Sequence, residues 1–181
     1  MRNFVMMAVL LAGCAIQPGE PRGGLFEVYR DTSVPLASKA VFSPQQFLGT
    51  WYEVARYPVP FEAGCVGVTA DYGALPDGRI SVRNTCRRPD GTVRSVIEGA
   101  ADIVGPARLK VRFASVPFVG ADLWVLWADG TYRTVVLGAP DGRSGSILNR
   151  DPVIPADRLE AARAMLAFNG YDLGRLMLVQ P

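Results

Sequence analysis

The chain contains no histidine and only two lysines, Lys39 and Lys110. Histidine is the usual general base and the commonest side-chain ligand of transition metals, so its absence excludes hydrolases that depend on a Ser-His or Cys-His pair. Schiff-base chemistry would have to use one of the two lysines. Three cysteines without histidine or a cluster of carboxylates do not make a zinc or iron site. We therefore expect no metal and no other cofactor, and the composition favours binding over catalysis.

Charge of one sign is not in excess either, because 19 Lys and Arg residues face 17 Asp and Glu residues, for a net charge of +2. This balance gives no basis for a nucleic-acid partner. The 181 residues are 49% hydrophobic, which is typical of one globular domain with a sizeable core.

The N-terminus has one positive charge, at Arg2, followed by an uninterrupted apolar run from Phe4 to Ala12. This run is shorter than the about 20 residues that span a bilayer and is typical of a signal peptide. It ends in Leu11-Ala12-Gly13-Cys14, which resembles the lipobox of bacterial lipoproteins. The resemblance implies a signal peptide over residues 1–13, a mature chain beginning at lipidated Cys14, and a lipoprotein of the outer membrane whose domain faces the periplasm. The alternative is an ordinary secretion signal followed by an unrelated cysteine.

Residues 14–40 are rich in proline and glycine and have no sustained periodicity. We expect them to carry the lipid anchor and to form a flexible tether.

Short apolar or alternating runs then recur at regular spacing, separated by turn signals such as Pro76-Asp77-Gly78 and Asp129-Gly130. This rhythm predicts an antiparallel barrel or sandwich. The eight predicted strands are residues 50–57, 66–74, 79–86, 92–103, 107–114, 122–128, 131–138 and 144–150. Spacing of three and four predicts one helix over 156–168, and the run 176–179 could pair with an edge strand. Sequential hairpins with one late helix favour an all-β, up-and-down barrel with one C-terminal helix over a Greek-key sandwich.

Three segments occur in the order and spacing of the lipocalin motifs. They are Gly49-Thr50-Trp51-Tyr52, Asp129-Gly130-Thr131-Tyr132 and Asn149-Arg150-Asp151-Pro152. The chain thus resembles the lipocalin family, most closely the branch of bacterial outer-membrane lipocalins and apolipoprotein D, and the resemblance implies a lipocalin domain over residues 41–181. Segments 68–72, 98–101 and 117–120 also match that branch. In the family the counterparts of Gly49, Trp51 and Arg150 are structural, with the indole at the closed end of the barrel and the guanidinium across it.

In a barrel every second residue of a strand points inward. Phasing on the lipocalin resemblance predicts an inward-facing, ligand-binding set made of Val68, Ala70, Tyr72, Ile80, Val82, Asn84, Ile97, Ala101, Leu109, Val111, Phe113, Val125, Trp127, Ser146 and Leu148. The outward-facing partners are then Asp71, Ser81, Arg83, Lys110 and Arg112. In the segment 122–128 both faces are apolar, so only the resemblance sets its phase.

The predicted lining contains no firmly inward charge, which favours an acyl chain over a catecholate or a haem. The resemblance implies a carrier or store of fatty acids or lysophospholipids, present as a monomer or a weak homodimer. Two alternatives remain open: an enzyme on a lipophilic substrate that uses Glu53 or Glu98 as a base, and a structural lipoprotein with a filled barrel.

If Pro76-Asp77-Gly78 is a hairpin turn, Cys65 and Cys86 lie opposite each other across the second and third predicted strands. A disulfide between them fits this geometry and an oxidising periplasm. The alternative is a reactive thiol.

Overall fold

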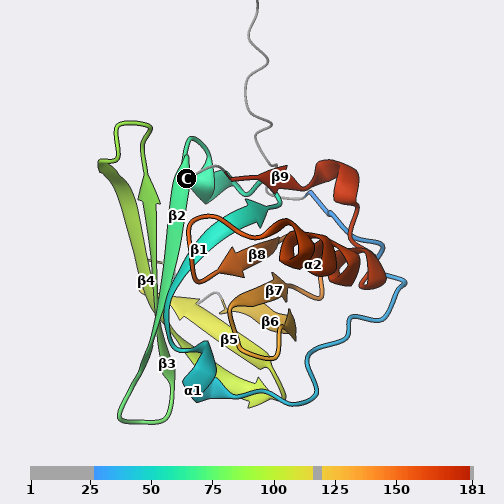
Figure 1. Cartoon of the computed structure of the whole chain (residues 1–181). Helices are drawn as coiled ribbons and strands as arrows, with labels where there is room; N and C mark the ends of the chain where they lie inside the picture. The colour runs from blue at the N-terminus through green and yellow to red at the C-terminus, as the bar shows by residue number, and fades with distance from the viewer. Residues whose placement is uncertain (1–26, 116–119, 180–181) are drawn as a thin grey trace, which may run out of the picture.

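The computed structural model describes residues 27–115 and 120–179. Eight antiparallel strands form a closed barrel in which each strand pairs with the next along the chain, and β1 pairs with both β2 and β8 (Figure 1). The strands are β1 (Gly49–Arg56), β2 (Gly67–Ala74), β3 (Ile80–Arg87), β4 (Val93–Gly105), β5 (Arg108–Phe113), β6 (Gly120–Ala128), β7 (Thr134–Gly138) and β8 (Gly145–Asn149). The predicted up-and-down barrel is confirmed, and closure leaves no free edge among these strands.

A short helix, α1 (Pro44–Phe47), closes one end of the barrel (Figure 1). Its Phe47 is fully buried, with its ring centre 4.4 Å from that of Tyr72 and 6.0 Å from that of Trp51. The indole of Trp51 donates a hydrogen bond to the carbonyl of Phe47 at 2.8 Å. The cluster of Phe47, Trp51 and Tyr72 therefore fixes α1 to the start of β1. No pattern in the sequence predicted this helix.

The predicted C-terminal helix is confirmed as α2 (Ala156–Phe168). It covers the outside of the barrel near β6 and β7, and its fully buried Ala162 and Leu166 belong to a second apolar cluster between helix and sheet. Phe168, which the spacing includes in the apolar face, is instead 68% exposed. After the helix, η2 (Leu173–Arg175) leads to β9 (Met177–Leu178), which pairs with β1 as a ninth strand outside the closure.

The predicted tether is wrong for residues 27–40, which lie against the barrel instead. Tyr29 is 2% exposed and its amide donates to the carbonyl of Gly142 at 2.8 Å. Arg30 is also buried, and its Nε donates to the carbonyl of Asn169 at 3.0 Å. Aromatic burial and buried hydrogen bonds hold this segment between the barrel and the end of α2, although its composition is that of a linker.

Residues 1–26, including the predicted signal peptide and Cys14, lie outside the described residues. The same is true of positions 117–119 in the segment 117–120 that matches the lipocalin branch. Within the described part, no helix has the length and apolar character needed to cross a membrane.

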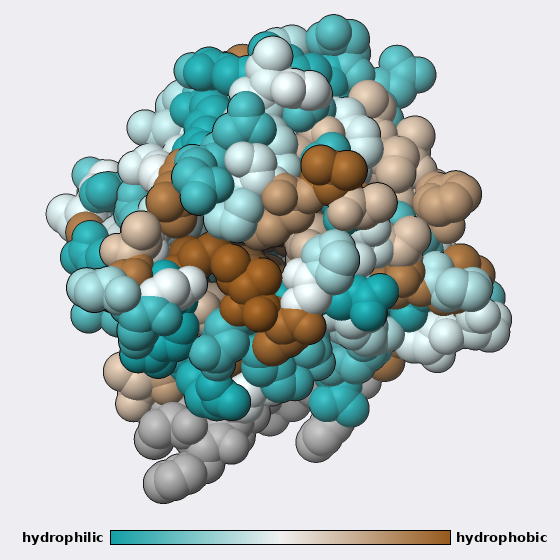
Figure 2. Space-filling model, turned by 90° about the horizontal axis from the view of Figure 1, so that it is seen from below, coloured by the Kyte–Doolittle hydropathy of each residue, from teal (hydrophilic) through white to brown (hydrophobic). Residues whose placement is uncertain are grey.

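When the molecule is seen from below the view of Figure 1, hydrophobic side chains gather around a hollow near the centre of the surface, and polar side chains surround them (Figure 2).

Candidate functional site

In the part of the chain that the structure describes, the inside of the barrel contains a packed region and a cavity. The packed region is next to α1 and contains Phe47, Trp51, Leu109, Val125 and Val135, all fully buried. The cavity has a volume of about 170 Å³ and reaches solvent beside Phe61, which is 53% exposed. The barrel is thus neither filled throughout nor hollow throughout.

The structure separates the predicted inward set into distinct locations. Nine of its members line the cavity: Val68, Ala70, Tyr72, Val82, Asn84, Val111, Phe113, Ser146 and Leu148. Four lie in the packed region instead: Ile80, Ala101, Leu109 and Val125. Ile97 is half-buried and lies outside the cavity lining. The alternation rule locates the inner face, whereas the depth of each strand within the barrel determines whether a residue meets the cavity.

The expectation that Trp127 faces the interior is wrong, because its side chain packs in the outer cluster against α2. The register between β6 and β7 shifts between Val125 and Trp127, so Leu126 is an extra residue in β6. A β-bulge of this kind reverses the alternation beyond it. Val125 therefore points inward while both Leu126 and Trp127 contribute to the outer cluster.

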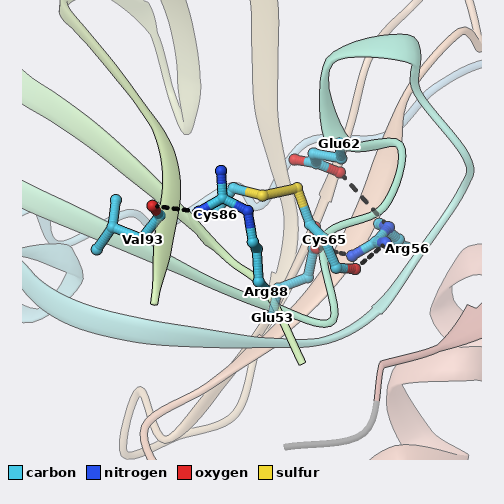
Figure 3. The surroundings of a disulfide bond; sticks show 7 residues. All are labelled: Glu53, Arg56, Glu62, Cys65, Cys86, Arg88 and Val93. Atoms are coloured by element: carbon cyan, nitrogen blue, oxygen red, sulfur yellow. Dashed lines mark hydrogen bonds and ion pairs between the residues drawn. A yellow bond between two sulfur atoms is a disulfide. The ribbon is translucent and has the colours of Figure 1, made fainter. Parts of the chain in front are cut away.

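The expectation of a lining without inward charge is also wrong. Glu53, Arg56 and Glu62 are 8%, 4% and 9% exposed, and all three line the cavity. Arg56 donates to Glu53 at 3.1 Å and to the carbonyl of Cys65 at 2.8 Å, and its Nε lies 3.7 Å from Glu62. Figure 3 shows Arg56 between the two carboxylates, beside the disulfide. The cavity therefore has an ionic wall at one side.

Burial perturbs the carboxyl groups of this wall. It raises the pKa of Glu62 to about 7, although the charge of Arg56 acts in the opposite direction. Burial, followed by the charge of Glu62, raises the pKa of Glu53 well above its usual value, against the opposing effect of Arg56. One arginine does not fully compensate two buried carboxylates, so the cluster takes up a proton more readily than exposed glutamates do.

Part of this ionic wall could have been predicted from the sequence. Glu53 lies two residues after Trp51 on the same strand, and a period of two puts both side chains on the inner face. Simple alternation from Glu53 would turn Arg56 outward. Its side chain points inward because the register of β1 against β8 shifts between Glu53 and Ala55. Glu62 lies on η1 (Pro60–Glu62), where no periodicity predicts its direction.

The predicted disulfide between Cys65 and Cys86 is present, with Cα atoms 5.4 Å apart (Figure 3). The register differs from the expected one, because Cys86 lies opposite Val68 rather than Cys65. Cys65 precedes β2 and its amide donates to the carbonyl of Glu62 at 3.0 Å. The bond therefore fastens the segment that carries Glu62 to β3, and these two sulfurs provide no free thiol.

Other candidate groups lie outside the cavity. Glu98, one of the two bases considered for an enzyme, is on the outer surface with its carboxylate 3.0 Å from Arg83. Residues 27–115 and 120–179 contain no group of three or more side chains suited to holding a metal ion.

The cavity combines a mostly apolar wall with a small polar side, an arrangement typical of small-molecule sites. An engineered apolar cavity of about 150 Å³ holds one benzene ring, so the 170 Å³ here admit a narrow group such as a segment of an alkyl chain. The opening beside Phe61 would leave the rest of a longer molecule outside.

Comparison with known proteins gives consistent matches. A family model described as "Lipocalin-like domain" matches residues 43–181. The outer membrane lipoprotein Blc of Citrobacter freundii is 35% identical over 142 residues, covering 77% of this chain and 79% of that protein. Apolipoprotein D of Macaca fascicularis is 31% identical over 187 residues, covering 96% of this chain and 94% of that protein. Insecticyanin from the tobacco hornworm Manduca sexta has the same fold, with a TM-score of 0.62 at 20% identity over 82% of this chain and 86% of that one.

Proposed function

The chain belongs to the lipocalin family, and we propose that it binds and carries a single-chain lipid, such as a fatty acid or a lysophospholipid, in the bacterial cell envelope. Lipocalins are generally binding proteins rather than enzymes. The observation that carries the proposal is the cavity beside Phe61, which has an apolar lining, an opening to solvent and one polar side.

Energetics support a single alkyl chain. Each buried methylene contributes about 0.8 kcal/mol, while association costs about 4 to 15 kcal/mol. A chain of ordinary lipid length therefore binds usefully only if most of its methylenes leave water. The half-exposed Phe61 and the neighbouring Val59 line the cavity and extend the apolar surface that a long chain would cover.

Two separate observations support a location at the outer membrane. The Leu11-Ala12-Gly13-Cys14 segment resembles a lipobox, and a relative with 35% identity is called an outer membrane lipoprotein. We propose that Cys14 carries the acyl anchor, that residues 15–26 connect it to the packed segment starting at residue 27, and that the barrel faces the periplasm. The oligomeric state that fits this arrangement is a monomer or a weak homodimer.

Native mass spectrometry tests the binding proposal. The protein is purified from a Gram-negative host as the chain from residue 15 onward, which contains the whole closed barrel, the packed segment 27–40 and α2. We expect an added mass that extraction resolves into a single-chain lipid, or binding after incubation with lysophospholipids and fatty acids. A mass that stays that of the bare chain after both treatments contradicts the proposal.

A further inference from the structure

The ionic wall of the cavity has an excess of acid. The charged side chains that line the cavity are Glu53, Glu62, Asp122 and Arg56. Asp122 has its own partner, Lys110, at 3.1 Å on the outer side. Among residues 27–115 and 120–179, the two glutamates share Arg56 as their ion-pair partner, so their cluster carries one net negative charge when both are ionised.

Three of the five N–H donors of Arg56 are directed at groups of the protein. Its two terminal nitrogens donate to Glu53 and to the carbonyl of Cys65, and its Nε faces Glu62. An anionic head group placed here would meet two carboxylates and one arginine that already pairs with both of them, and like charges at short distance in a poorly solvated site repel strongly.

The cavity also contains an acceptor without a donor. Asn84 lines the cavity, and its Oδ1 is buried with no hydrogen-bond partner among the described residues. A buried acceptor left unpaired is costly to the folded state, and a ligand that donates a hydrogen bond to it recovers that cost. Both the charge and the unpaired acceptor therefore call for a donor.

We propose that this cavity selects single-chain amphiphiles whose head group is cationic or neutral and donates hydrogen bonds, such as an ammonium or a hydroxyl, over free carboxylates. Glu53, Glu62 and Asn84 are the residues that determine this specificity. The inference rests on the proposed function, since it requires a lipid in the cavity. It narrows that proposal, because among single-chain lipids it disfavours free fatty acids, whose head group is a carboxylate.

Three ligands with the same 16-carbon chain and different heads test the proposal: hexadecylamine, hexadecanol and hexadecanoate. Each displaces the neutral fluorescent probe N-phenyl-1-naphthylamine from the chain starting at residue 15, at pH 8 and below the aggregation limit of the ligand. This pH lies above the value of about 7 to which burial raises the pKa of Glu62, and burial also raises the pKa of Glu53. The ammonium and the carboxylate are both charged, so their comparison isolates the sign of the charge from general polarity.

We expect hexadecylamine to bind at least about tenfold more tightly than hexadecanoate. Glu62→Gln should reduce this ratio several-fold, and Asn84→Leu should weaken the binding of hexadecanol. Glu98→Gln is the matched control, because it removes the same charge from the outer surface, where Glu98 pairs with Arg83, and should leave the ratio unchanged. Circular dichroism verifies that each variant is folded, and Asn84→Leu keeps the test available if Glu62→Gln is not.

Hexadecanoate binding as tightly as hexadecylamine would overturn the inference. So would a ratio that Glu62→Gln leaves unchanged, together with a hexadecanol affinity that Asn84→Leu leaves unchanged. In both cases the proposed lipid binding would stand. If none of the three ligands displaces the probe or binds, the proposed function itself fails.

Discussion

The guanidinium of Arg150 lies 3.6 Å from the ring centre of Trp51, across the closed end of the barrel. Its Nη2 also donates to the carbonyls of Gln46 and Leu48, at 2.7 and 2.8 Å, and its Nη1 donates to that of Thr50 at 2.8 Å. One side chain thus joins the end of β8 to both α1 and the start of β1.

We expect Arg150→Gln to lower the free energy of unfolding by about 2 to 4 kcal/mol, because it removes a cation-π contact and several charge-assisted hydrogen bonds. Urea denaturation measures the change. Arg133→Gln is a suitable control, since the Arg133 side chain forms an exposed ion pair with Asp151 at the neighbouring turn. A loss for Arg150→Gln no larger than that for Arg133→Gln would contradict the role given to this residue.

Gly49 belongs to the same arrangement. Its φ is +97°, and a Cβ added there would lie 3.2 Å from Nη1 of Arg150. The first glycine of the lipocalin motif is therefore required both by the backbone conformation and by the close approach of the arginine.

The disulfide should stabilise the fold substantially. Its sequence separation is 21 residues, and closing a loop of that length contributes about 3 kcal/mol in the chain-entropy model. We expect the double variant Cys65→Ser/Cys86→Ser to lose about this much in denaturant unfolding, with thiol titration of the unreduced parent detecting neither sulfur. Equal stability of the parent with and without reductant would contradict this prediction.

Stability should depend on pH through Glu62. Burial raises its pKa from 4.5 to about 7 in the folded chain, so between these values the folded state holds a proton that the unfolded state has released. The contribution to stability is fully present below about pH 4.5 and is lost as the pH rises through about 7. Glu53 acts in the same direction.

Thermal melting between pH 4.5 and 8 checks this dependence. Because Gln mimics the protonated carboxyl, Glu62→Gln should melt at a more constant temperature over this range than the parent. Profiles that run parallel for the two proteins would show that the Glu62 carboxyl is not perturbed by folding.

Filling the cavity should abolish ligand binding. Ala70 lines the cavity, whereas Ala74 is exposed on the same strand and lies outside the lining. We expect Ala70→Phe to eliminate any lipid adduct in native mass spectrometry, at a cost of about 1 to 3 kcal/mol from overpacking. Ala74→Phe should retain the adduct, and loss of the adduct in both variants would argue against the assigned cavity.

The lipid anchor has a direct biochemical test. Cells that express the full chain and grow with radiolabelled palmitate should incorporate label into the protein, and Cys14→Ser should prevent incorporation. Cys65 and Cys86 are paired, so their replacement by serine provides the matched control and should leave the label in place. Label that persists in Cys14→Ser would assign the acylation to another residue.

Several features of the molecule follow from local patterns in the sequence. Alternation along β2, β3 and β5 locates the inner face, because the side chains of a strand point to opposite sides in turn. The helix over 156–168 has the bounds that its spacing predicts. The lipocalin motifs also predict which residues meet at the closed end, since each motif is local although the contact between Trp51 and Arg150 is not.

What the tertiary structure alone decides is where these patterns are interrupted and where they meet. The bulge in β6 moves Trp127 to the outer surface, and residues 27–40 pack against the barrel because Tyr29 and Arg30 find buried partners near α2. The ionic wall depends on the shift in β1 that turns Arg56 inward and on the disulfide that fastens the segment carrying Glu62. A periodic pattern predicts the direction of each side chain only while the register of the strand is unbroken. The position of a bulge and the contacts of an irregular segment are determined by partners that are distant in sequence.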